Sequence, residues 1–307
     1  MLDSVWAVVT SFRPTGLGQT VQRIRLQTRG VVVVDDGSGP VFSDELTSAR
    51  EAGADVIALA ENAGIAAALN TGIARAFELG ADAVVTFDQD SSIGPSFIAS
   101  LVGTHNSEAD CARMGPVVPQ FFADVAQATK EDARGRLLAE NAIQSGMLIP
   151  RAVVEVMGPF REDFFIDLVD TEFELRCRAA GRPVRAVRGL RLEHRLGARY
   201  VPDNRALRLL SPVTLSAPFR YYYRARNRIL LERAFARRFP GPLLRAALMD
   251  RLHFLLALLI ARPRREMWAV LCAGGRDARR GVGGRAPGRV LDRAQTVRWA
   301  AERVPES

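Results

Sequence analysis

The chain almost lacks lysine: of its 42 basic residues only Lys130 is a lysine, and all the others are arginines. Cysteine is also scarce. The cysteines Cys111, Cys177 and Cys272 are far apart, which indicates neither a disulfide framework nor a CxxC metal site. The longest apolar run near the C-terminus, residues 252–261, is about half of the roughly 20 residues that a membrane-spanning helix needs.

A signal peptide is not indicated at the N-terminus, because Asp3 stands where such a peptide carries positive charge and a strand-like stretch follows at once. The apolar fraction of 48% excludes intrinsic disorder. With 307 residues, the chain has enough length for one large domain or two smaller ones. We therefore expect a cytoplasmic protein in a reducing compartment.

Charge is divided unevenly along the chain. Residues 1–170 carry 12 basic and 23 acidic side chains, a net charge of −11. Residues 171–307 carry 30 basic and 11 acidic side chains, a net charge of +19, and the two halves sum to +8. Codon bias explains arginine in place of lysine but not its concentration at one end. The basic half is therefore expected to face a polyanion or an anionic surface.

Strand-like and helical segments alternate through the first hundred residues. The expected strands are residues 5–10, 31–34, 56–59 and 82–87, and the expected helices are residues 18–28, 43–53 and 65–79. Short strands that alternate with helices predict βαβ units and an α/β fold with a mostly parallel sheet. The strand segments are apolar on both faces, as expected for a sheet covered by helices on both sides.

The pattern changes in the second half of the chain. A strand at residues 147–150, a helix at 170–181 and a strand at 184–194 are expected first, and then arginine-rich helices at 219–239 and 243–261. The Gly- and Arg-rich tail from Arg262 has no pattern that predicts firm structure. We expect a catalytic domain over residues 1–200 and a helical basic region over residues 201–307.

Four carboxylates follow expected strands: Asp35, Asp36, Asp88 and Asp90. Ligands of parallel α/β sheets bind beyond the carboxyl ends of the strands, so this placement indicates a site. Hard divalent cations such as Mg²⁺ bind one or two carboxylates together with substrate phosphates, which suits the pair in Asp88-Gln89-Asp90. Such a triplet alone is weak, since a solvated loop after a strand has the same composition.

Three segments occur in order at compact spacing: VVVVDDGS at 31–38, NAGIAAALNTG at 62–72 and FDQDS at 87–91. With these segments the chain resembles the family 2 glycosyltransferases, and within them the bacterial rhamnosyltransferases. The resemblance implies a GT-A fold, a nucleotide-sugar-binding αβα sandwich, followed here by a helical arginine-rich C-terminal extension.

The resemblance continues further along the chain. FIDLVDTEF at 165–173, followed by Arg176, is similar to the acceptor-side segment of that family, and His194 to its distal histidine. YYRARN at 222–227 resembles a helix motif of the family, and the Gly/Arg-rich tail is similar to its C-terminal part. The match covers roughly residues 5–290.

The resemblance implies a set of site residues. The implied catalytic base is Asp170, the implied metal ligands are Asp88, Asp90 and His194, and the implied donor-binding residues are Asp35, Asp36, Asn62, Gly64, Asp88, Arg224 and Arg226. Asp35 is expected to recognise the nucleotide base. The implied cofactor is Mg²⁺ or Mn²⁺, because two carboxylates and an imidazole suit these ions.

Each of these residues has a plainer interpretation. Asp170 lies at a helix start, where carboxylates are favoured by the helix dipole. His194 is flanked by charged residues and suits a surface ion pair. Ser145-Gly146 marks either an acceptor subsite or a tight turn. The aromatic and arginine residues at 221–228 suit either phosphate contact or a solvated basic helix face. His105 and His253 lack a supporting motif, which favours structural roles.

The expected function is an inverting, metal-dependent transfer of L-rhamnose from dTDP-β-L-rhamnose to a cell-surface polysaccharide or its lipid-linked precursor. The acceptor would be a saccharide or a lipid-pyrophosphate-linked molecule, with peripheral contact at the inner face of the cell membrane. One alternative keeps this chemistry with UDP-galactofuranose or a UDP-hexose as donor. An alternative of another class is a non-catalytic basic protein that binds membrane or nucleic acid. No nucleic-acid partner is expected, because no helix-turn-helix, RNP or zinc pattern accompanies the charge.

Overall fold

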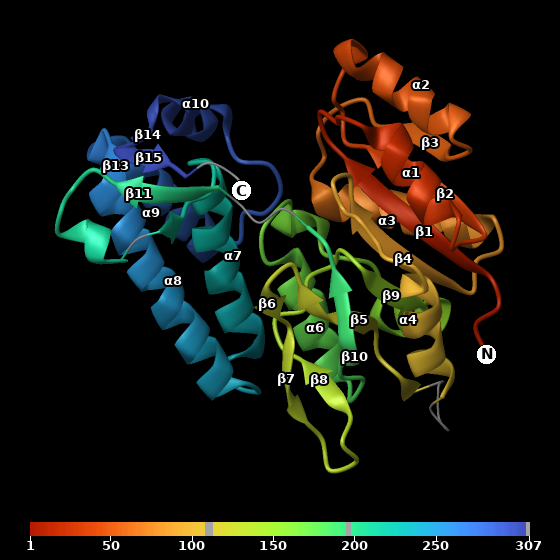
Figure 1. Ribbon diagram of the computed structural model, residues 1–307. Helices are drawn as coiled ribbons and strands as arrows, with labels where there is room; N and C mark the ends of the chain where they lie inside the picture. The colour runs from red at the N-terminus through yellow and green to blue at the C-terminus, as the bar shows by residue number, and fades with distance from the viewer. Residues whose placement is uncertain (108–112, 195–197, 211, 305–307) are drawn as a thin grey trace. The chain divides into compact units, whose positions relative to one another are not determined.

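The computed structural model describes residues 1–107, 113–194, 198–210 and 212–304 (Figure 1). The chain forms two compact units. Unit 1 comprises Met1–Glu162 and Val169–Arg195, and unit 2 comprises Asp163–Leu168 and Leu196–Ser307. The sequence placed the boundary at residue 200 and did not show that a six-residue segment before Asp170 belongs with the C-terminal part.

Unit 1 is built on one large sheet. Its strands, in spatial order, are β3 (Asp55–Ala58), β2 (Gly30–Asp35), β1 (Val5–Ser11), β4 (Ala83–Asp88), β9 (Met147–Pro150), β5 (Val117–Phe122), β10 (Arg185–Leu192), β8 (Leu137–Ala139) and β7 (Ala128–Glu131), with β6 (Val125–Ala126) paired to β5. Strands β3, β2, β1 and β4 run parallel. This half of the sheet confirms the parallel βαβ pattern that the sequence predicted.

The strand register brings the carboxyl ends of these strands to one edge of the sheet. Thr10 of β1 lies opposite Val34 in β2 and opposite Asp88 in β4, and Ser11 lies opposite Asp35. The carboxylates that follow β2 and β4 therefore share one edge, where α/β sheets bind their ligands.

The other half of the sheet is mixed. Strand β9 runs antiparallel to both of its neighbours, β4 and β5, while β5 and β10 are parallel. The sequence identified β9 as a strand but not its direction, because the pairing partner of a short apolar strand is set by distant residues.

Helices cover both faces of the parallel half of this sheet. The helices of unit 1 are α1 (Leu17–Arg25), α2 (Ser43–Glu51), α3 (Ile65–Glu78), α4 (Phe97–Asn106), α5 (Arg151–Met157) and α6 (Val169–Ala179). Side chains alternate along a strand, so Ala7 and Val9 of β1 pack in the core with α1, α2 and α4. Val8 faces α3, where a Cβ on Gly72 would lie 2.4 Å from its side chain. Glycine at this position therefore allows α3 to approach the sheet closely.

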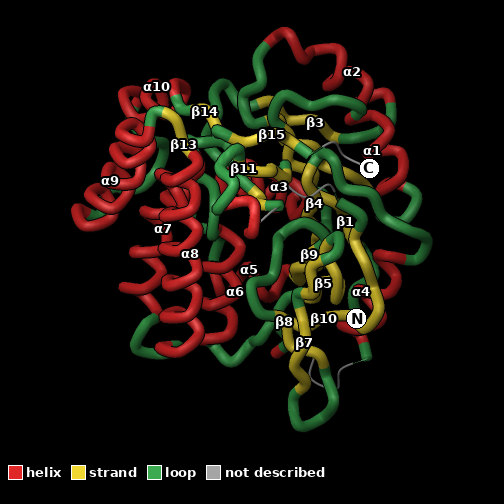
Figure 2. Tube along the Cα trace, turned by 60° about the vertical axis from the view of Figure 1, so that its left-hand side comes forward, coloured by secondary structure: helices red, strands yellow, loops and turns green. Residues whose placement is uncertain are grey.

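Unit 2 is mainly helical (Figure 2). Its helices are α7 (Arg220–Phe235), α8 (Pro240–Ile260), α9 (Arg264–Arg280) and α10 (Gly288–Thr296), and its short strands are β11 (Arg199–Pro202), β12 (Val213–Thr214), β13 (Ala261–Arg262), β14 (Arg298–Trp299) and β15 (Ala301–Arg303). Among the described residues, no helix has both the length and the apolarity to span a membrane. Pro240 starts α8, since proline is well tolerated in the first turn of a helix.

The expectation of no firm structure after Arg262 is wrong, because α9 and α10 lie there. The glycines that weakened the helical pattern allow α9 to pack closely on α7: a Cβ on Gly274 would lie 2.3 Å from the carbonyl oxygen of Tyr222. The sequence shows that glycine is present but not the neighbouring helix that requires it.

The two cysteines that the structure describes, Cys177 and Cys272, are both free thiols. Cys111 lies outside the described residues.

Candidate active site

Strand β4 and the end of β10 bring together Asp88, Asp90 and His194. A short antiparallel bridge between Ser92 and Glu193 joins the loop after β4 to the end of β10. One ligand atom from each of the three side chains lies within 4.8 Å of the others. His194 is more than a hundred positions from the two aspartates in the sequence, so the fold brings together the residues that the motifs predicted.

The imidazole of His194 lies in a buried niche. Its side chain is 14% exposed, its ring centroid lies 4.5 Å from that of Phe122, and Nδ1 lies 3.6 Å from Oδ1 of Asp90. Nδ1 is buried and makes no hydrogen bond within the protein. Two carboxylates and an unsatisfied imidazole nitrogen are a donor set that suits Mn²⁺ or Mg²⁺, so the residues present fit a divalent cation. The same contact with the half-exposed Asp90 also suits the ion-pair interpretation of His194, so its role as a metal ligand stays a prediction.

Asp88 is held by two neighbours from the turn before β9. The Gln144 side-chain amide donates to Oδ1 of Asp88 at 2.6 Å, and the Asp88 backbone N–H donates to Oγ of Ser145 at 3.1 Å. Removal from water raises the pKa of Asp88 to about 6. The charges of Asp90 and Asp170 act in the same direction, and His194 opposes them. Asp170 is therefore close enough to this group to act on it electrostatically.

Asp170 lies in the first turn of α6, where its Oδ1 accepts a hydrogen bond from the Thr171 backbone N–H at 2.8 Å. The neighbouring Glu172 is 3% exposed and forms an ion pair with Arg176 at 2.8 Å. Arg176 also donates to the carbonyls of Met157 and Pro159. Glu172 is thus fixed in an internal network, and Asp170 is the partly exposed carboxylate of this helix start.

The carboxylates at the end of β2 organise the loops around them. Oδ2 of Asp35 accepts a hydrogen bond from the Ser38 backbone N–H at 2.9 Å, and Asp35 is 2% exposed. Asp36 accepts from the backbone N–H groups of Ala63 and Gly64 at 2.7 and 3.0 Å. Asp36 therefore holds the turn that starts α3, and the predicted donor-binding residues Asp35, Asp36 and Gly64 lie together with Asn62 at the carboxyl edge of the sheet. Their contact with a donor stays a prediction.

Gly146 has a backbone conformation that favours glycine. It has a φ of +81°, and a Cβ there would lie 3.2 Å from Phe97 and 3.3 Å from Leu192. The Ser145 hydroxyl lies 2.7 Å from that of Ser91. The tight-turn interpretation of Ser145-Gly146 therefore accounts for its contacts. The two isolated histidines are structural: His105 is buried with a pKa lowered by burial, and His253 contacts the hydroxyl of Tyr221 at 3.1 Å.

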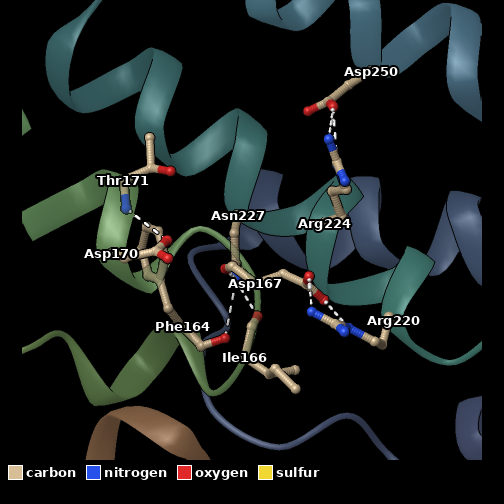
Figure 3. Close-up of polar contacts among 9 residues, drawn as sticks. All are labelled: Phe164, Ile166, Asp167, Asp170, Thr171, Arg220, Arg224, Asn227 and Asp250. Atoms are coloured by element: carbon tan, nitrogen blue, oxygen red, sulfur yellow. Dashed lines mark hydrogen bonds and ion pairs between the residues drawn. The ribbon is translucent and has the colours of Figure 1, made fainter. Parts of the chain in front are cut away.

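Within unit 2, helix α7 holds the segment 163–168, which leads directly into α6 (Figure 3). The Asn227 amide donates to the carbonyls of Phe164, Ile166 and Asp167 at 2.7–2.9 Å. Arg220 pairs with the Asp167 carboxylate at 2.6 Å. The segment is thus fixed through its backbone as well as through the ion pair of Asp167 with Arg220.

This segment needs such support because its backbone is strained. Phe165, Asp167 and Leu168 have φ values of +64°, +65° and +63°. A non-glycine residue in the left-handed region costs about 1 kcal/mol or more, and several in one segment persist only when the surroundings fix them. The contacts from α7 offset this cost.

Arg224 and Arg226 of the YYRARN motif in α7 contact other residues of the same chain. Arg226 is fully buried, and its guanidinium donates to the carbonyls of Asp163, Phe164 and Gly284. This partner set differs from the phosphate contact that the sequence suggested, because the sequence shows the charge of Arg226 but not its burial. Arg224 is 41% exposed and pairs with Asp250 at 2.7 Å, and its contact with a donor stays a prediction.

Replacing Asn227 with alanine is expected to destabilise unit 2 by about 2 kcal/mol. The change leaves the carbonyls of Ile166 and Asp167 without the amide that donates to them, and each unsatisfied, partly buried carbonyl costs about 1 kcal/mol. Amide hydrogen exchange across residues 163–168 and α7 measures the effect, because the two units need not unfold together.

The matched control is Asn204→Ala, which removes an exposed asparagine that accepts only a local hydrogen bond from the Ala206 backbone N–H. It should leave the exchange of residues 163–168 unchanged. Equal exchange in the two variants would show that Asn227 does not hold the segment. Sequence reasoning singled out Asn227 through the YYRARN motif but did not assign it this task.

Asp88, Asp90 and His194 form a group of two carboxylates and an imidazole at the carboxyl edge of the parallel strands. Such a group is suited to group transfer from a phosphorylated donor. The comparison with known families defines the class: the protein is a glycosyltransferase. Residues 6–139 match Glycosyl transferase family 2, so the chain carries a domain of this family. The predicted α/β fold with parallel strands and a helical C-terminal extension is confirmed.

The chain is also similar to individual proteins. The chain is 28% identical over 249 residues to dTDP-rhamnosyl transferase RfbF of Shigella flexneri, a match that covers 76% of this chain and 81% of that protein. Among solved structures, it is similar to S. aureus TarS 1–349, with a TM-score of 0.47, 13% identity and coverage of 91% of this chain and 92% of the other. A second is 4-diphosphocytidyl-2C-methyl-D-erythritol synthase, with a TM-score of 0.38, 14% identity and coverage of 60% and 88%.

Proposed function

We propose that the protein transfers L-rhamnose from dTDP-β-L-rhamnose to a saccharide or lipid-pyrophosphate-linked acceptor, with inversion at the anomeric carbon. The observation that carries the chemistry is the group Asp88, Asp90 and His194, whose ligand atoms lie within 4.8 Å, with Asp170 near enough to raise the pKa of Asp88. The resemblance to a dTDP-rhamnosyl transferase supports the donor.

Asp170 is the proposed base. The acceptor hydroxyl attacks the anomeric carbon as the bond between that carbon and the diphosphate oxygen breaks, the hydroxyl proton passes to the Asp170 carboxylate, and dTDP leaves with the bonding electron pair. A positioned carboxylate is needed because the hydroxyl has a pKa far above neutral. The partial exposure of Asp170 in the first turn of α6 allows an acceptor to reach it.

Asp88, Asp90 and His194 are the proposed ligands of Mg²⁺ or Mn²⁺. A divalent cation at this position supplies positive charge against the developing charge of the leaving diphosphate. Gln144 and Ser145 orient Asp88 through the contacts described above. Asp35, Asp36, Asn62 and Gly64 are the proposed nucleotide-binding residues, which is supported by their position at the edge where α/β sheets bind ligands.

The donor is tested by nucleotide release in the presence of Mg²⁺ or Mn²⁺. We expect turnover of dTDP-rhamnose to exceed that of UDP-galactofuranose and UDP-glucose by at least about tenfold, because a site that binds one sugar and base through paired hydrogen bonds rejects analogues that leave those groups unpaired. Protein carrying Asp170→Asn serves as the control for contaminating hydrolases. Turnover with a UDP-sugar alone would overturn the donor assignment and keep the enzyme class.

We also propose that the enzyme works in the cytoplasm at the inner face of the cell membrane. The support is the net charge of +19 on residues 171–307, since basic segments are attracted to anionic lipid headgroups. Acceptor identity is tested separately, by product analysis with lipid-linked and free saccharides.

A further inference from the structure

Helix α8 carries an apolar stripe on its solvent side. Five leucines lie three or four residues apart, and their side chains are between 37% and 69% exposed: Leu244, Leu248, Leu252, Leu255 and Leu259. At 100° per residue this spacing keeps them within an arc of about 80° of the helix. The opposite side of α8 is buried within unit 2 through Leu243, Ala247, Ala257 and Ile260. The stripe is therefore a second apolar face, which the described part of unit 2 leaves uncovered.

The charge around this stripe has one sign. Residues 240–280 contain eight arginines, and all eight are exposed. The same residues contain three acidic side chains, and each has a partner within the protein. Asp250 pairs with Arg224 and Arg228. Asp277 accepts a hydrogen bond from Tyr222, and Glu266 pairs with Arg265 and Arg293. On the helix, Arg251 and Arg245 flank the leucine stripe on its two sides.

A groove of about 610 Å³ lies beside the stripe, lined by residues of α7, α8 and α9. Its apolar wall includes Phe254, Leu255, Leu258 and Trp268, and Arg251, Arg276 and Arg279 also line it. Trp268 is 59% exposed, which is unusual because tryptophan has the largest of the apolar side chains. Tryptophan with neighbouring arginines is typical of residues that lie at the level of lipid headgroups.

The chemistry of this surface favours one kind of partner. A second copy of the chain packed stripe to stripe would bring the flanking arginines of the two copies together, and like charges in contact are unfavourable. A nucleic acid would use the arginines but leave the leucines in water. An anionic bilayer takes up both, since leucines enter the acyl region while arginines contact phosphates.

We propose that the leucine stripe of α8, with Trp268 and the flanking arginines, is a docking surface for an anionic phospholipid bilayer, on which α8 lies in the plane of the interface. This proposal rests on the proposed function at the membrane and identifies the surface through which the enzyme would bind there. The binding itself needs no sugar and no metal, so it can be tested independently of the proposed chemistry.

The test is co-sedimentation of the full chain with vesicles of phosphatidylglycerol and phosphatidylcholine, compared with vesicles of phosphatidylcholine alone. We expect binding to the anionic vesicles, and weaker binding in about 0.5 M NaCl than in about 0.1 M NaCl because salt screens the arginines. Leu248→Gln with Leu252→Gln should weaken partitioning by at least about tenfold. Arg245→Gln with Arg251→Gln should weaken it by about 30-fold at low salt and flatten its salt dependence.

The matched control is Arg23→Gln with Leu26→Gln on unit 1, which removes one exposed arginine and one exposed leucine from the C-terminal end of α1. It should bind as the unchanged protein does. Nucleotide release from the donor should be the same in all these variants, which shows that they are folded and separates this proposal from the proposed function.

Three results would overturn the proposal. The first is no sedimentation with anionic vesicles at low salt. The second is equal binding by the α8 variants and the unit 1 control. The third is self-association without vesicles that the Leu248 and Leu252 changes abolish, since the stripe would then cover a second copy of the chain.

Discussion

Asp170→Asn is expected to lower kcat by about 10³-fold while the protein stays folded and binds its donor normally. General acid–base groups contribute about 10²–10⁴-fold, and asparagine cannot accept the hydroxyl proton. The asparagine oxygen can still accept the hydrogen bond that the Thr171 backbone N–H donates to Asp170. The measurement is the initial rate of rhamnose transfer at saturating donor, with donor affinity from calorimetry.

The comparison variant is Glu155→Gln, which removes an exposed carboxylate from α5. It should keep full activity. If Asp170 acts only as a helix-start carboxylate, Asp170→Asn would cost about 0.3–1 kcal/mol of stability and leave kcat almost unchanged. That outcome would remove Asp170 from the proposed mechanism and leave the cation site intact.

Chelation of divalent cations by EDTA is expected to reduce transfer by about 10²-fold or more, because the cation offsets several kcal/mol of developing charge on the leaving diphosphate. Asp90→Asn should shift the Mn²⁺ concentration needed for half-maximal activity upward by about 100-fold, with recovery at high Mn²⁺. Oδ1 of Asp90 lies 3.6 Å from Nδ1 of His194, so losing its charge weakens the donor set without disturbing the buried packing around Phe122.

Binding provides a second measurement that does not depend on turnover. Mn²⁺ should raise the melting temperature of the unchanged protein, because a ligand that binds only the folded state stabilises it. The increase should be absent in Asp90→Asn and retained in Asp44→Asn, an exposed carboxylate on α2. Equal stabilisation of the two variants would place the cation elsewhere in the protein.

The parallel half of the sheet could be predicted because its signals are local. Each strand is a short run of β-branched residues, each helix starts and ends within a few residues of its expected bounds, and Asp35 and Asp88 end the strands β2 and β4. Residues at the ends of adjacent parallel strands meet by geometry alone. Asp88 and Asp90 follow the same strand, β4, so this part of the cation group could be anticipated, and the family resemblance added His194.

What could not be predicted depends on partners distant in the sequence. The antiparallel insertion of β9 between β4 and β5, the close packing of Gly274 on α7 and the complete burial of Arg226 are all set by neighbours that no local pattern shows. The sequence does not distinguish an arginine at the surface from an arginine buried among backbone carbonyls. The sequence therefore singled out the YYRARN helix but assigned Arg226 to a ligand, whereas its guanidinium donates to backbone carbonyls.

The assignment of residues 163–168 to unit 2 has a consequence for protein engineering. The chain passes from one unit to the other before and after this segment, so the C-terminal region is not a module that a single junction near residue 200 can exchange. A chimera joined near residue 200 would separate Asp167 from Arg220 and the segment's carbonyls from Asn227. Chimeras should therefore transplant residues 163–168 together with Leu196–Ser307, as a split insert with three crossover points: before residue 163, after residue 168 and before residue 196.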